Sequence, residues 1–525
     1  MNSLSEQAQL NPQKKNRQIT TPIRIGKDIL EFLTGAMYVD PLVIYREYVQ
    51  NAVDAIEEAQ SAGLYKNGNE PTIEIFLDQK ERSIRIRDNG IGVTARKFAT
   101  RLSAIGGSEK RGKNKRGFRG VGRLSGLGYA QQVIFRSRAS ATAKTLVMTW
   151  DGRTLKDLLR RSDYDGALAD AVKAVATVAS EDSNNEPAHF FEVELRGVLR
   201  IKNDTLMNEQ QVRFYLSQVV PVPFHTEFSF GARIDSFLNE FEEKSQYVLW
   251  LNDGKGAICR PHTNSFQFGK QGKDDFGELE FIKLSGIDGE LDAVGWILHH
   301  SYYGALSRTT GLPGVRVRSG GIQVGSIDLL ASMFPEPRFN SWCVGELHIL
   351  NNKIVPNGRR DDFEENVHYQ NLQGQFAPYA KRLTKLCREK SIVRNRLKNV
   401  NTEIEAAHSR MYLLNNRKTA IFMRDYVERS VQGSIRRLKS TIALDGLEST
   451  DRQLVAREVE VLTERLANAL RGSIREHEVA LSASKRQAYE EVLGLICELA
   501  PDANTAQQLV EKVTTRIIGA SRTKS

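Results

Sequence analysis

The chain has 525 residues, too many for a single hydrophobic core, so about three domains are expected. Hydrophobic residues make up 40% and charged residues 26%, an ordinary globular balance, and no apolar run reaches the roughly 18 residues of a membrane helix. The four cysteines lie far apart without a CxxC pair, which argues against a disulfide framework or a zinc site and favours a reducing compartment. We therefore expect a cytoplasmic protein with no membrane partner.

The net charge of +10 is concentrated in one part of the chain. Residues 381–440 hold sixteen Lys and Arg against five Asp and Glu, and a second basic cluster runs from Arg101 to Arg123. A basic surface can attract phosphates, nucleic acid or acidic proteins, although a solvated helix face accounts for such a run equally well. The charge thus leaves the kind of partner open.

The first elements expected are an arm, a helical region and a sheet. Residues 1–20 are polar and are predicted to form a flexible N-terminal arm. Residues 24–60 have a helical pattern that breaks near Pro41 and stops at Gly63. Strand-like alternation then begins at residue 71 and recurs up to residue 200, interrupted by a stretch rich in Gly, Lys and Arg. We predict an α+β domain over residues 21–200, with helices on one face of a mixed sheet.

Two further domains are expected after residue 200. Several strand-like runs between 201 and 370 predict an α+β middle domain, similar in role to a transducer domain. From 371 to 525 the strand signals vanish and the amphipathic spacing is helical. We predict a basic helical C-terminal domain that serves as a bundle or dimerisation module.

The first motif is a polar stripe on the predicted helix before Gly63. Glu47, Asn51 and Asp54 lie at i, i+4 and i+7, so all three project from one helix face. A carboxylate and a carboxamide one turn apart can orient a water and supply an oxygen ligand to Mg²⁺. Alone the motif is weak, because helices often carry such residues on a wet face.

The second and third motifs are rich in glycine. Asp88 ends a predicted strand and is followed by Gly90 and Gly92, so a tight turn places an acceptor where it can meet the exocyclic amine of a base. Further along lie Ser108 and a run whose backbone N–H groups can hold phosphate oxygens, namely Gly117, Gly120, Val121 and Gly122. A basic segment between them is long and polar enough to be a lid. No Walker-type sequence is present, and no strand directly precedes the glycine run, which disfavours a dinucleotide-binding fold.

The order and spacing of the three motifs resemble the GHKL (Bergerat-fold) ATPases, and most closely their ninety-kilodalton heat-shock chaperone branch. Glu47 to Ala55 is similar to that branch's ELISNASDA helix, and Asp88 to Gly92 is similar to its DxGIGM turn. Gly117 to Gly122 resembles its GQFGVGF run, and residues 355–361 resemble its LNxSRE segment. The match covers roughly residues 24–370.

The resemblance implies a site for ATP and Mg²⁺. By that match Glu47 orients the attacking water, Asn51 ligates Mg²⁺ and Asp88 binds the adenine amine. Arg360, with Arg359 as the second choice, reaches back to the terminal phosphate. The remaining implied contacts to the nucleotide come from Asp54, Gly90, Gly92, Ser108, Gly117, Gly120, Val121 and Gly122.

Three features depart from the family pattern. The chaperones usually have Asn where Arg101 falls, and a Gly-Thr pair before a late strand, where this chain has Ala188 and His189. The lid is unusually basic, and the last 150 residues match nothing in the family. The outer contacts to the nucleotide are therefore left open.

Two functions from different classes compete. The first is a slowly ATP-hydrolysing, chaperone-like homodimer that works as an ATP-gated clamp on a client protein. The second is an ATP-dependent nucleic-acid clamp of MutL-like or MORC-like type, in genome maintenance or phage defence, which the basic residues 381–440 favour. A histidine kinase fits poorly because no helical His segment precedes the ATP domain, and a scaffold that only binds ATP would leave Glu47 idle.

Overall fold

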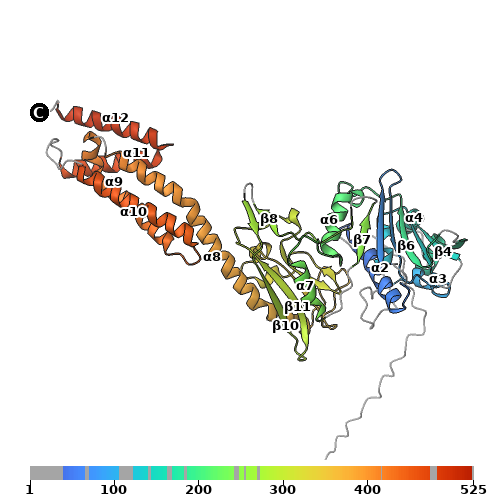
Figure 1. Ribbon diagram of the computed structural model, residues 1–525. Coiled ribbons are helices and arrows are strands. Elements are labelled where there is room, and N and C mark those ends of the chain that lie inside the picture. Colours follow the sequence, from blue (N-terminus) through green and yellow to red (C-terminus); the bar gives the residue numbers. More distant parts are fainter. Residues whose placement is uncertain are drawn as a thin grey trace, which may run out of the picture.

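Figure 1 shows the computed structural model, in which two sheet-containing parts are followed by a bundle of long helices. The structure describes residues 40–65, 70–105, 122–139, 144–161, 168–182, 186–241, 247–252, 256–268, 272–414, 417–472 and 482–522. The predicted arm at 1–20 and the first part of the predicted helix at 24–60 lie outside these residues. The predicted class, α+β with a helical C-terminal region, is confirmed.

A seven-stranded sheet forms the N-terminal part, with the strand order β5-β4-β3-β6-β2-β1-β7. All neighbouring strands are antiparallel except β1 and β7, which are parallel. β1 and β2 form a hairpin in which Ile75 pairs with Ile86, as the alternation predicts. The strands are β1 (Thr72–Asp78), β2 (Ser83–Asp88), β3 (Gln132–Arg138), β4 (Lys144–Asp151), β5 (Ala176–Asp182), β6 (Phe190–Arg196) and β7 (Val248–Leu251).

Helix α2 (Val43–Ser61) supplies much of the core beside this sheet. Its buried side chains Tyr45, Val49, Val53 and Ile56 share one apolar cluster with the inward residues of β1, β2, β3 and β6. The helix ends at Ser61, and Gly63 follows with a left-handed φ of 66°, as predicted. The other helical elements here are α3 (Ala95–Ser103), η2 (Gly122–Gly128), α4 (Gly152–Arg160) and α5 (Leu168–Val175).

The N-terminal sheet extends past the predicted domain boundary at residue 200. Strand β7 lies beside β1, and helix α6 (Glu209–Val219) places Val212 and Leu216 in the same core as α2. α6 also contacts β13 (Ile322–Val324) of the next sheet, whose Ile322 belongs to that core. The two sheet-containing parts are therefore joined through α6.

The middle part contains a five-stranded sheet with the order β10-β11-β14-β12-β13. β12 and β14 are parallel and the other neighbours are antiparallel. This sheet comprises β10 (Glu278–Ser285), β11 (Leu291–His299), β12 (Gly314–Ser319), β13 and β14 (Val344–Ile349), accompanied by α7 (Gly231–Asn239) and the hairpin of β8 (Ser265–Phe268) and β9 (Gly272–Asp275). The short elements between them are η3 (Thr205–Met207), η4 (Arg308–Thr310), η5 (Ala331–Met333) and η6 (Pro337–Trp342).

A buried carboxylate on β14, Glu346, ties this sheet to α6. Its two oxygens lie 2.7 Å from the guanidinium groups of Arg260 and Arg318, and all three residues are at most 5% exposed. Burial by itself would raise the pKa of Glu346, but the charges of Arg260 and Arg318 hold that pKa well below its usual range. Arg318 also donates to the carbonyl oxygen of Gln218 on α6 at 2.7 Å.

From residue 367 onward the described residues form helices and short connections. α8 (Val367–Tyr412) packs first on the middle sheet and then on α9 (Arg417–Ile442) and α10 (Ser449–Gly472). α11 (Ala483–Leu499) and α12 (Ala503–Arg522) complete the bundle, whose core includes Met423, Val431 and Leu462. Over the described ranges, no helix is both long and apolar enough to cross a membrane.

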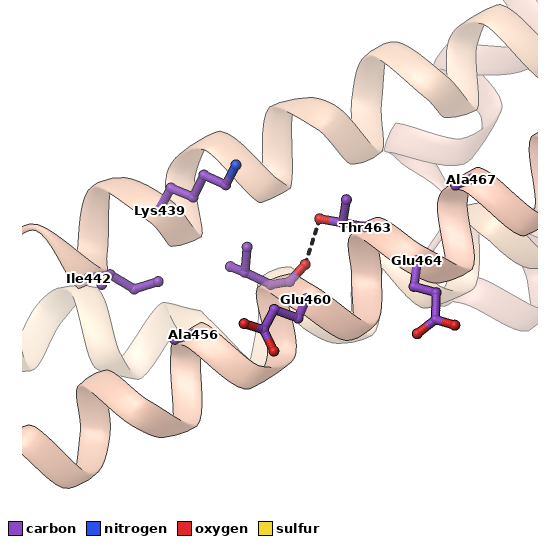
Figure 2. Close-up of a pocket in the computed structure, with 8 residues that line it drawn as sticks. Lys439, Ile442, Ala456, Glu460, Thr463, Glu464 and Ala467 are labelled. Atoms are coloured by element: carbon purple, nitrogen blue, oxygen red, sulfur yellow. Dashed lines mark hydrogen bonds between the residues drawn. The ribbon is translucent and has the colours of Figure 1, made fainter.

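A groove of about 580 Å³ runs between α9 and α10 (Figure 2). Lys439 lies on the α9 side, and the carboxylates of Glu460 and Glu464 lie on the α10 side. The lining is mostly apolar, and Thr463 bonds its own helix, donating to the carbonyl oxygen of Val459 at 2.7 Å. The groove is therefore a feature of helix packing in the bundle.

The Glu346 cluster generates a stability prediction. Glu346→Gln leaves Arg260 and Arg318 buried without their anion, so we expect the free energy of unfolding of the middle part to fall by about 3 kcal/mol. The exposed Glu278→Gln on β10, which β11 separates from β14 in the same sheet, is the matched control and should change this free energy little.

The same pair of variants can be compared across pH by urea denaturation. A carboxyl whose pKa is depressed in the folded state stabilises the fold above its unfolded pKa, here about 4.5, and loses this contribution as the pH falls towards the folded value. The gap between wild type and Glu346→Gln should therefore narrow below about pH 4.5. A gap that stays constant down to pH 3 would contradict the assignment of the ion pair.

Candidate active site

Helix α2 presents the predicted polar stripe beside the end of β2. Glu47 is 8% exposed and Asp54 2%, whereas Asn51 is partly exposed on the turn between them. Burying two carboxylates on one helix face is costly unless nearby groups compensate them, so this stripe is not an ordinary wet face. The three residues lie on one side of α2, as the spacing predicts.

The two oxygens of the Glu47 carboxylate face different neighbours. Oε1 accepts a hydrogen bond of 3.0 Å from Nη2 of Arg46, the preceding residue, which is itself 5% exposed. Oε2 lies against Gly122, where an added Cβ would come within 2.3 Å of it. Gly122 is the last residue of the glycine run and the first residue of it that the structure describes, and a side chain there would displace the Glu47 carboxylate from this position.

The middle part reaches α2 through the segment that contains Arg359 and Arg360. The same Arg46 Nη2 donates to the carbonyl oxygen of Arg359 at 3.2 Å. Arg360 is 7% exposed and has a left-handed φ of 57°, and its carbonyl oxygen accepts from the Gly325 amide at 2.9 Å. The structure therefore brings the 355–361 segment to the stripe on α2, and the hydrogen bond from Arg46 to Arg359 is one contact between them.

The turn after β2 packs closely on the far end of α2. The Gly90 amide donates to Asp88 Oδ1 at 2.9 Å, and the Ile91 amide donates to the carbonyl oxygen of Ala55 at 3.0 Å. A Cβ on Gly90 would lie 2.7 Å from both Ala55 and Asp88. Asp88 is 4% exposed, so the turn holds a buried acceptor beside Ala55, the residue that follows Asp54 of the stripe.

Two aromatic side chains that the motifs did not indicate hold this turn in place. His189 Nδ1 lies 2.9 Å from the carbonyl oxygen of Gly90, and the hydroxyl of Tyr65 donates to the carbonyl oxygen of Asn89 at 3.1 Å. Burial, with the nearby charge of Asp88, raises the pKa of Tyr65, so its hydroxyl remains a donor. In the sequence, position 189 stood out because it has His where the family has Thr before β6. That difference indicated a lost nucleotide contact and gave no sign that His189 bonds the turn after β2.

The structure places some predicted residues and not others. Glu47, Asn51, Asp54, Asp88, Gly90, Gly92, Gly122 and Arg360 are described, and they lie along α2, the turn after β2, the start of η2 and the 355–361 segment. Ser108, Gly117, Gly120 and Val121 lie outside the described residues, as does the predicted lid between Ser108 and Gly117.

The described residues fit a nucleotide whose phosphates bind Mg²⁺. Asp88 is a buried acceptor of the kind that a base amine would need, and Gly122 places no side chain against Glu47 Oε2. Among the described residues no group of three His, Cys, Asp or Glu could hold a metal. Mg²⁺ needs few protein ligands when phosphates and waters supply the others, so a single amide oxygen such as that of Asn51 would be enough to hold it.

Comparisons with known proteins match the part of the chain that carries this site. Residues 42–171 match the family described as histidine kinase-, DNA gyrase B- and HSP90-like ATPase. The chaperone protein HtpG of Polaromonas naphthalenivorans (strain CJ2) is 29% identical over 139 residues, which cover 23% of this chain and 22% of that protein. HtpG of Borreliella afzelii (strain PKo) is 31% identical over 144 residues, covering 24% and 23% respectively. HtpG of Cronobacter sakazakii (strain ATCC BAA-894) is 25% identical over 263 residues, covering 46% and 38%.

The resemblance inferred from the motifs is thus confirmed for the N-terminal part of the chain. That part is a GHKL-type ATPase domain, the class shared by histidine kinases, DNA gyrase B and HSP90. Within this class, the relatives named above are all chaperone proteins HtpG. The aligned segments span only about a fifth to two fifths of those relatives.

Two glycines allow a test of how tightly the turn is built. Gly92 has φ of 68°, and a Cβ there would lie 2.1 Å from the carbonyl oxygen of Arg138, whereas Gly63 has a similar φ of 66° with nothing within 4 Å. We expect Gly63→Ala to lower the free energy of unfolding by about 1 kcal/mol, the cost of the left-handed backbone, and Gly92→Ala by roughly 3 kcal/mol or more. Equal losses in urea denaturation would show that the turn can relax away from Arg138.

Proposed function

We propose that the chain binds ATP with Mg²⁺ and hydrolyses the ATP slowly. The observation that carries this proposal is the Glu47 carboxylate, buried on α2, with one oxygen bonded to Arg46 and the other facing Gly122. A buried carboxylate that keeps one oxygen directed at a glycine-rich segment is suited to accept a proton from a water beside a bound phosphate.

The base and the phosphates are assigned to opposite ends of α2. Asp88 accepts a hydrogen bond from the exocyclic amine of adenine, and Gly90 and Gly92 let the backbone close beside the ring. Asn51, with Asp54 on the same face, lies between the two ends, and its amide oxygen ligates Mg²⁺. The cation neutralises charge on the phosphate oxygens. Ser108, Gly117, Gly120 and Val121 are assigned to the phosphates on the resemblance alone.

Hydrolysis is assigned to Glu47 with help from the middle part. Glu47 takes the proton of the attacking water, whose oxygen bonds to the terminal phosphorus while the bond to the bridging oxygen breaks and ADP leaves. Arg46 holds Oε1 of Glu47 at 3.0 Å, which leaves Oε2 directed at the glycine-rich segment. Arg360 supplies positive charge to the terminal phosphate, and its segment is already bonded to α2 through Arg46 and Arg359.

The catalytic role of Glu47 predicts a separation of binding from turnover. Glu47→Ala should retain ATP binding but turn over at least ~100-fold more slowly, the range expected when a general base is lost. Glu81→Ala, an exposed residue between β1 and β2, is the control and should hydrolyse ATP like wild type. Steady-state phosphate release measures both, and wild-type-like turnover in Glu47→Ala would reject the assignment.

We further propose that the chain acts as a homodimeric, ATP-gated clamp on a client protein. Val492, Leu495 and Leu499 lie at i, i+3 and i+7 on α11 and are 53%, 54% and 81% exposed. Such a stripe on one helix face is typical of a surface that pairs with a second copy. The names of the relatives as chaperone proteins support a protein client, and the four free cysteines fit a cytoplasmic location.

A second candidate, a nucleic-acid clamp, is favoured by the middle of α8. Between the middle sheet and the bundle this helix is solvent-exposed over most of its surface, and Arg394, Arg396 and Lys398 are all exposed there. Figure 1 shows α8 running from the middle sheet-containing part to the helical bundle. Cations on an exposed helix of this kind can contact a phosphate backbone.

The nucleic-acid candidate predicts a change in salt dependence. Reversing two charges with Arg396→Glu and Lys398→Glu should lower the slope of log affinity against log salt for duplex DNA by about 2. The control is the double variant Lys80→Glu and Lys173→Glu, which makes the same change in charge at exposed positions far along the chain from α8. It should lower the slope by less than 1. Absence of DNA binding by wild type, or equal slopes in both variants, would leave the protein-client function as the better account.

A further inference from the structure

His189, a buried histidine, bonds the turn that carries Asp88. It directly precedes β6, is 7% exposed, and has Nδ1 at 2.9 Å from the carbonyl oxygen of Gly90. A carbonyl oxygen can only accept, so Nδ1 must carry the proton and act as the donor. The imidazole therefore donates here whether the ring is neutral or protonated.

Gly90 connects His189 to Asp88 through two hydrogen bonds. Its carbonyl group is held by His189, and its own amide donates to Asp88 Oδ1 at 2.9 Å. There is no spare room around it, because an added Cβ would meet Ala55 and Asp88 at 2.7 Å. A residue fixed on both sides in this way determines which way the Asp88 carboxylate is turned.

The imidazole itself is held by packing. Its ring meets Tyr65 edge-on, with the centroids 6.0 Å apart and the planes at 76°. Tyr65 in turn donates to the carbonyl oxygen of Asn89, the residue between Asp88 and Gly90. His189 and Tyr65 thus support adjacent peptide groups of the same turn.

We propose that His189 is a positioning residue for base recognition, which makes the site selective for adenine over guanine nucleotides. Through Gly90 it fixes the Asp88 carboxylate, which can only accept hydrogen bonds. Adenine offers an amino group to that acceptor, whereas guanine presents a carbonyl oxygen at the same ring position and would leave the buried carboxylate opposed by another acceptor. Selectivity requires a carboxylate that cannot turn away. This inference rests on the proposed nucleotide site.

The test compares two substitutions of His189 in the full chain. His189→Phe keeps a ring against Tyr65 but removes the donor, whereas His189→Gln keeps an N–H that can reach the Gly90 carbonyl. Dissociation constants for ADP and GDP, with Mg²⁺, are measured by calorimetry, since the diphosphates separate binding from turnover. We expect the preference for ADP to fall roughly tenfold in His189→Phe, about the worth of one hydrogen bond, and to stay within about threefold of wild type in His189→Gln.

Each outcome bears on the inference. A folded His189→Phe with an unchanged ADP preference overturns the role of His189 while leaving the nucleotide site intact. If His189→Phe does not fold, His189→Leu takes its place under the same criterion, and the ADP preference of His189→Gln still has to match that of wild type. A wild-type chain that binds neither nucleotide overturns the proposed function, and the inference with it.

Discussion

The structure depends on one constraint, the burial of helix α2 between the N-terminal sheet and α6. A helix buried along most of its length would normally be apolar, yet α2 carries Glu47 and Asp54 at 8% and 2% exposure. The ion pair between Arg46 and Glu47 meets part of this cost locally. The other Glu47 oxygen faces Gly122, so the compensation leaves one side of the carboxylate directed at the glycine-rich segment. The feature that is hardest to accommodate in the fold is thus the one that the proposed chemistry uses.

The same region connects the two sheet-containing parts. Arg46 bonds both Glu47 and the carbonyl oxygen of Arg359, so any movement of the 355–361 segment changes what surrounds the carboxylate. On the other side, α6 shares a core with α2 and is fastened through Gln218 to Arg318, which pairs with the buried Glu346. Two routes therefore link α2 to the middle sheet, one through Arg46 and one through α6 and the buried ion cluster of Glu346. This arrangement suits a clamp in which nucleotide state and domain position are coupled.

Local sequence patterns predicted the helix faces and the hairpin pairing of this fold. The spacing of Glu47, Asn51 and Asp54 placed them on one helix face, and alternation placed Ile75 and Ile86 in one hairpin. The pairing of β7 with β1 could not be predicted, because the four residues of β7 pair in parallel with residues 176 positions earlier (Thr72 with Val248) and leave no local signature of their partner. The contacts of Arg46 with Arg359 and of His189 with Gly90 bridge 313 and 99 positions, so they depend on how the domains pack and not on any nearby sequence pattern.

Binding of ATP with Mg²⁺ to the full chain, measured by calorimetry beside Asp88→Asn, tests the central claim most directly. The substitution keeps the volume of the side chain but replaces one acceptor oxygen of a buried carboxylate with a donor, opposite the base amine. The account predicts one saturable site per chain in wild type and an affinity at least roughly tenfold lower in Asp88→Asn. No binding by wild type, or equal affinities in the two proteins, would contradict it.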